Sequence, residues 1–98
     1  MKKKVAIIGV KGSVGQEFVQ SLDNHPWFEV TQIAASERSA GKNYLDAIRD
    51  ASGIIAWDVS GPIPDYIKEM KVLTIDEIDI TDLDLIFSAL ESVAARDI

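Results

Sequence analysis

The stretch that decides the fold is Val5–Val19, "VAIIGVKGSVGQEFV". It begins with a continuous apolar run, Val5 to Ile8, which predicts a strand buried on both faces. A helical pattern starts at Ser13. Between the two lie three glycines spaced three residues apart, Gly9, Gly12 and Gly15. The stretch therefore predicts a strand that turns tightly into a helix.

Glycines in such a turn have distinct physical roles. One permits the tight turn, one lets the backbone approach a pyrophosphate, and one lets the helix pack close to the strand. The start of the helix also presents unpaired N–H groups and a partial positive charge to an anion. The spacing G-x-x-G-x-x-G differs from the commoner G-x-G-x-x-G. A phosphate cradle is therefore the favoured interpretation, and a purely structural turn is the alternative.

Strands and helices alternate along the rest of the chain. The first helix is expected to run from Ser13 to Asn24, with an apolar stripe formed by Val14, Phe18, Val19 and Leu22. Further strands are expected at Phe28–Ala35, Val72–Ile75 and Leu83–Ala89, and further helices at Lys42–Ala51, Pro64–Glu69 and from Ser92. Gly53–Trp57 is ambiguous and could be a short strand. The alternation predicts an α/β domain with a mainly parallel sheet.

The composition restricts the class of protein. A length of 98 residues suggests a single domain spanning residues 1–98. The formal charge of −6 argues against nucleic-acid or anionic-membrane partners, which require a positive field. No apolar run is long enough for a membrane helix, and "MKKKVAIIG" is too short for a signal peptide, so a cytoplasmic location is expected. Trp27, between Pro26 and Phe28, is expected to be a packing anchor.

A second motif, "AASERSAG", follows the second predicted strand. In dinucleotide folds an acidic residue at this point accepts the ribose 2′-hydroxyl, whereas an arginine accommodates a 2′-phosphate. The segment offers both, as Glu37 and Arg38, flanked by the hydroxyls of Ser36 and Ser39. A guanidinium with two hydroxyls suits a phosphate. A plain polar loop remains the alternative.

Taken together, the motifs resemble the N-terminal cofactor domain of aspartate-semialdehyde dehydrogenase, of the archaeal and fungal-like branch. The resemblance covers "VAIIGVKGSVGQEFVQSLDNHPWFEVTQIAASERSAGKNY" and resumes at "IPDYIKEMKVLTID" and "DLDLIFSALESVAARDI". Its most specific parts are "DNHPWFEV" and "ASERSAGK". Arg49 to Gly61 matches poorly.

The resemblance implies a truncated, Rossmann-like NAD(P)-binding domain with NADP as its cofactor. The family reduces aspartyl phosphate with NADPH in amino-acid biosynthesis, through a thioester on a cysteine and with a histidine as acid–base. Three groups of residues would hold the cofactor. The pyrophosphate turn would be Gly9, Gly12, Ser13, Val14 and Gly15; the 2′-phosphate site would be Ser36, Arg38 and Ser39; the adenosine side of the cleft would be lined by Ser88, Ala89 and Leu90.

Three residues depart from the family pattern. Lys11 stands where the family usually has threonine, and it could either attract a phosphate or alter the turn with its bulk. Glu17 stands where the family often has a basic residue, and Glu91 where it has proline. Both would add negative charge near the cofactor.

The chain contains no cysteine, so it lacks the family's nucleophile and is not catalytically competent alone. The alternative function is a non-catalytic Rossmann scaffold or interaction module, trimmed or redesigned, that has lost its ligand. Because the resemblance ends within the enzyme, we also expect apolar surface at the last strand and self-association through it.

Overall fold

A computed structural model describes residues 2–49 and 52–89 of the chain. Its centre is a four-stranded sheet in the order β3-β2-β1-β4, in which every pairing is parallel. The strands are β1 (Lys3–Ile8), β2 (Phe28–Ala34), β3 (Val72–Leu73) and β4 (Leu85–Ser88). This order is that of a Rossmann half-fold. The predicted α/β class with a mainly parallel sheet is confirmed.

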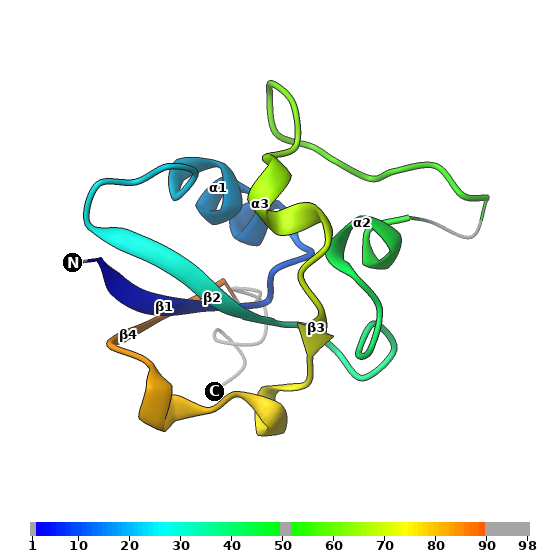
Figure 1. Ribbon diagram of the computed structural model, residues 1–98. Helices are drawn as coiled ribbons and strands as arrows, with labels where there is room; N and C mark the ends of the chain where they lie inside the picture. Colours follow the sequence, from blue (N-terminus) through cyan, green and yellow to red (C-terminus); the bar gives the residue numbers. More distant parts are fainter. Residues whose placement is uncertain (1, 50–51, 90–98) are drawn as a thin grey trace, which may run out of the picture.

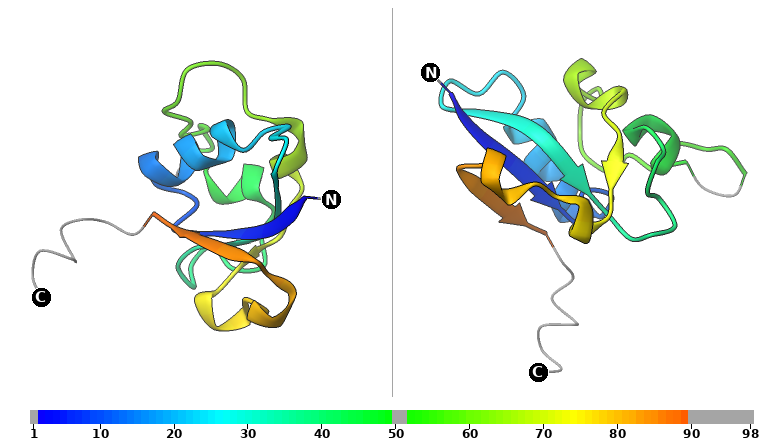
Figure 2. Two further views of the ribbon diagram at one scale, coloured as in Figure 1. Left: turned by 90° about the vertical axis from the view of Figure 1, so that its left-hand side faces the viewer. Right: turned by 60° about the horizontal axis from the view of Figure 1, so that its bottom comes forward.

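The two faces of the sheet are covered differently. The helices α1 (Ser13–Ser21), α2 (Tyr44–Ala47) and α3 (Asp65–Lys68) lie on one side (Figure 1). The connection between β3 and β4 crosses the other side and carries two short 3-10 helices, η1 (Ile75–Glu77) and η2 (Ile80–Asp82) (Figure 2). A pair of hydrogen bonds holds this connection to β2: the Gln32 side-chain Nε2 donates to the Asp79 carbonyl, and the Asp79 N–H donates to Gln32 Oε1.

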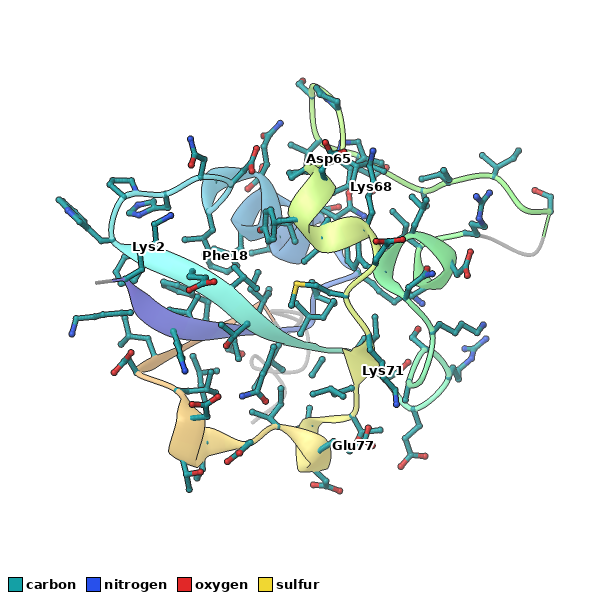
Figure 3. The ribbon with its side chains drawn as sticks, viewed as in Figure 1. Lys2, Phe18, Asp65, Lys68, Lys71 and Glu77 are labelled. Atoms are coloured by element: carbon teal, nitrogen blue, oxygen red, sulfur yellow. The ribbon has the colours of Figure 1, made fainter. Side chains whose placement is uncertain are left out.

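The core lies between the sheet and the three helices. Val5 and Ile7 of β1 are fully buried, as expected for a central strand that pairs on both edges. Phe18 extends from α1 toward the sheet (Figure 3) and stacks on Phe87 of β4, with ring centroids 5.2 Å apart. β4 is thereby tied to the helical layer as well as to β1.

Helix α1 is shorter than predicted, and its apolar stripe differs at one position. It ends at Ser21, and Asn24 has a left-handed φ of 55° that a continuing helix does not allow. Val14 was predicted on the stripe but is 54% exposed. Of the predicted stripe, only Phe18, Val19 and Leu22 reach the core.

Other elements also differ from the prediction. The helix expected at Lys42–Ala51 is only one turn, Tyr44–Ala47, and the third strand stops at Leu73 because η1 begins at Ile75. Gly53–Trp57 forms no strand and contributes a single antiparallel bridge, from Ile55 to Arg49. Trp27 is not a packing anchor: it is 68% exposed, while its neighbour Phe28 points inward. No helix among the described residues is long and apolar enough to cross a membrane.

Gly15 sets how closely α1 approaches the turn that precedes it. A Cβ built on Gly15 would lie 2.2 Å from the carbonyl oxygen of Gly9 and 2.8 Å from the Val10 backbone. Both neighbours are backbone atoms and cannot rotate away. The third glycine of the opening stretch is therefore required for packing.

We expect Gly15→Ala to destabilise the fold by about 3 kcal/mol, because the added methyl group forces α1 away from the sheet. Gly41→Ala is the control. Gly41 has a φ of 87° but no heavy atom within 4 Å of its virtual Cβ, so its cost should be only about 1 kcal/mol. Urea unfolding followed by circular dichroism measures both. Equal losses for the two variants would contradict this account.

Candidate functional site

The predicted site residues gather where three neighbouring strands end. Ile8 of β1 is aligned with Ala34 of β2 on one side and with Ser88 of β4 on the other. The glycine turn, the "AASERSAG" loop and the end of β4 therefore leave the sheet at the same edge. This is the edge at which open α/β sheets bind ligands.

The first part of the turn is fixed by the neighbouring strand. Gly9 has a φ of 78°, and its N–H and that of Val10 both donate to the Ala34 carbonyl, at 3.0 and 3.2 Å. The Gly9 N–H is therefore already used, and the role of Gly9 is to make the turn. From β4, the Ala89 N–H donates to the Ile8 carbonyl at 2.8 Å.

The second part of the turn is open. Within the described part of the chain, the backbone N–H groups from Lys11 through Gly15 have no hydrogen-bond acceptor. The first intrahelical bond runs from Gln16 N–H to the Gly12 carbonyl, and α1 has neither a capping side chain nor an acidic residue in its first turn. These N–H groups and the helix dipole make a cradle suited to an anion.

A buried glutamine fixes the shape of this cradle. Gln16 is only 1% exposed, and its Nε2 donates to the carbonyls of Lys11 (2.9 Å) and Ala56 (2.8 Å). Its Oε1 accepts the Asp58 N–H at 2.7 Å. Gln16 therefore joins the turn to Ala56 and Asp58, which belong to the range Arg49 to Gly61 where the resemblance to the family is poor. Sequence reasoning missed it because a polar residue beside a helical stripe usually faces solvent.

Tyr44 holds the glycine turn through a hydrogen bond to the Val10 carbonyl. Its ring is fully buried and its hydroxyl donates to the Val10 carbonyl at 3.1 Å. Burial raises the pKa of the Tyr44 hydroxyl, so the proton needed for this bond is retained. Sequence periodicity placed Tyr44 on an apolar helix face and gave no sign of this second role.

The loop after β2 contacts the glycine turn through two predicted site residues. Lys11 Nζ donates to Ser39 Oγ at 2.7 Å, and Ser39 is 3% exposed. Ser36 and Arg38 are exposed on the same loop. A hollow of about 320 Å³, lined by Ser36, Glu37 and residues following β3, lies beside them.

Asp58 brings a carboxylate to the open end of α1. Its Oδ2 lies 3.5 Å from Ser13 Oγ, and its backbone is held by Gln16. It is the one carboxylate that the described hydrogen bonds connect to the first turn of α1. The sequence gave no signal for this contact, because the two residues are far apart in the chain and Arg49 to Gly61 follows no motif.

The predicted residues among those described thus lie on the glycine turn, on the loop after β2 and at the end of β4. Ser88 ends β4 and Ala89 follows it, and both lie beside Ile8, at the edge where the resemblance would put the adenosine side of the cleft. Leu90 lies outside the described residues, as do Glu91 and the helix expected from Ser92.

Comparison with known proteins identifies the family. Residues 4–98 match the family described as "Semialdehyde dehydrogenase, NAD binding domain". The aspartate-semialdehyde dehydrogenase of Archaeoglobus fulgidus is 40% identical over 98 residues, which is 100% of this chain and 26% of that protein. That of Trichophyton rubrum is 37% identical over 97 residues, 99% of this chain and 25% of that protein.

A solved structure agrees with the sequence matches. The aspartate semialdehyde dehydrogenase of Candida albicans, crystallised with NADP, superposes with a TM-score of 0.80 at 35% identity, covering 99% of this chain and 25% of that one. The chain thus spans about a quarter of the length of the relatives it matches. It belongs to the family of semialdehyde dehydrogenase NAD-binding domains, whose ligand is a nicotinamide dinucleotide.

Proposed function

We propose that this chain binds NADP(H) as the cofactor domain of an aspartate-semialdehyde dehydrogenase. The observation that carries the proposal is the run of open backbone N–H groups from Lys11 through Gly15 at the start of α1. Beside this run lies a loop with Arg38 and two serines. A dinucleotide with a 2′-phosphate needs both features.

The pyrophosphate end of the ligand suits the turn. Gly15 leaves no room for a side chain between α1 and Gly9, so the first turn of α1 stays close to the strand ends. Because Gln16 and Tyr44 hold the carbonyls of Lys11 and Val10, the adjacent N–H groups are fixed before a ligand arrives. A site organised in advance loses less entropy on binding.

The 2′-phosphate end suits the loop after β2. Arg38 is exposed and forms none of the ion pairs found among the described residues. Its guanidinium is thus available for a bidentate contact with a phosphate. Ser36 and Ser39 supply hydroxyls on either side of it.

The chemistry of the proposed enzyme requires more than this chain. The bound nicotinamide would supply the hydride, whereas these residues would bind the adenosine and pyrophosphate. With no cysteine in the sequence, the thioester step has to be carried by residues outside it. The reduction of aspartyl phosphate is therefore proposed for the whole enzyme.

Calorimetric titration with NADPH and NADH tests the cofactor assignment. We expect NADPH to bind more tightly, and Arg38→Ala to weaken NADPH about tenfold or more through the loss of a charge-assisted contact. Arg49→Ala is the matched control, because Arg49 is paired with Asp46 at the end of α2. If neither cofactor bound at millimolar concentration, the scaffold alternative would replace this proposal.

Asp58 should oppose binding of the pyrophosphate. We expect Asp58→Asn to tighten NADPH and NADH binding by a similar factor of about three to ten, because it removes an anion from the open end of α1. Asp65→Asn is the control, since its carboxylate pairs with Lys68 on α3. Unchanged affinity in Asp58→Asn would show that its carboxylate does not act on the ligand.

Self-association through β4 is part of the proposal. β4 is an edge strand, and Leu85 and Ile86 are 42% and 43% exposed. We expect sedimentation velocity to show dimers as concentration rises, and Ile86→Lys to shift the protein toward the monomer. A wild-type monomer across a hundredfold range of concentration would argue against this surface.

A further inference from the structure

We propose that Lys11 is a specificity residue that selects NADP over NAD. This inference rests on the proposed function and adds a second cation to its 2′-phosphate site. Lys11 belongs to the glycine turn, but its ammonium group is anchored on the other loop, at Ser39 Oγ. A residue of the pyrophosphate turn thereby places its charge at the 2′-phosphate position.

Both ends of Lys11 are held. Its carbonyl oxygen accepts the Gln16 Nε2 proton at 2.9 Å, and its Nζ donates to Ser39 Oγ at 2.7 Å. Ser39 is itself fixed, since it is buried and its N–H donates to the Ser36 carbonyl at 3.0 Å. The ammonium group therefore does not sweep through solvent as a surface lysine does. It has further N–H donors for a second acceptor.

No ion pair among the described residues neutralises this charge. Among the described residues, the ion pairs engage Lys4, Lys68 and Arg49, and none engages Lys11 or Arg38. Lys11 and Arg38, neither of them in an ion pair, thus lie on or against one loop whose only carboxylate is Glu37, in a chain whose net charge is −6. Such a local positive region is what a phosphate site on an acidic protein requires.

The two cofactors differ at the group this charge would face. NADP carries a phosphate on the ribose, whereas NAD carries a neutral hydroxyl. A fixed cation strengthens binding of the first far more than of the second, because the ammonium group attracts the full negative charge of the phosphate but meets only a dipole at the hydroxyl. If Lys11 acted on the pyrophosphate instead, its removal would weaken both cofactors alike.

The test uses two variants that both remove the charge of Lys11 and differ in whether the side chain can still donate a hydrogen bond. Lys11→Met keeps the length of the side chain and removes the charge and the bond to Ser39. Lys11→Gln removes the charge but can still donate a hydrogen bond. Lys3→Met, at the opposite end of β1, is the control for the change in net charge. Thermal melts establish that each variant is folded, and the dissociation constants for NADPH and NADH are measured for each.

We expect both Lys11 variants to weaken NADPH binding about tenfold, while the affinity for NADH changes by less than twofold. Lys3→Met should change neither dissociation constant. If NADPH binds the wild type and the NADPH-to-NADH ratio is unchanged in both Lys11 variants, the inference is wrong and the proposed function stands. Equal weakening of both cofactors also overturns it, in favour of a role at the pyrophosphate. If the wild type binds neither cofactor, the proposed function itself fails.

Discussion

The close contact between α1 and the Gly9 carbonyl is the constraint on which the other features of the site depend. No side chain can occupy this contact, because a Cβ on Gly15 would overlap backbone atoms of the preceding turn. With the helix held there, its first N–H groups lack acceptors among the described residues. Because β1 pairs with β2 and with β4, the loop after β2 and the end of β4 lie at the same edge of the sheet. On the proposed function, packing and ligand binding would therefore require the same glycine.

A turn this open needs support from elsewhere, and polar side chains supply it. A side-chain amide buried without partners would lower the folding stability by about 1–3 kcal/mol. In Gln16, however, Nε2 donates to two backbone carbonyls and Oε1 accepts a backbone N–H. Tyr44 does the same for the Val10 carbonyl. These bonds satisfy carbonyls and leave the neighbouring N–H groups free. The support is thus of the kind that organises an anion site without filling it.

The sequence predicted the elements whose signals are local, and failed where distant residues decide. The glycine spacing and the apolar run at Val5–Ile8 were enough for β1, the turn and α1, and the "AASERSAG" motif was enough to locate the second loop. The extent of α2 was overestimated because its apolar spacing persists to Ala51, whereas the chain leaves the helix after Ala47 to pair Arg49 with Ile55. The contacts of Gln16, Asp58 and Tyr44 join segments 34 to 45 residues apart, and no local pattern encodes such a pairing.

Two of the departures from the family pattern, Glu17 and Lys11, have unequal physical weight. Glu17 is exposed and lies beyond the first turn of α1, so solvent screens its charge from the anion cradle. Lys11 is tethered across the site at 2.7 Å, where a charge keeps most of its effect because its position is fixed. Asp58, which belongs to no family motif, brings its carboxylate to 3.5 Å from Ser13 Oγ at the start of α1. On the proposed function, the affinity for the pyrophosphate and the preference for the 2′-phosphate would thus be set by different residues on different loops, and each could change without the other.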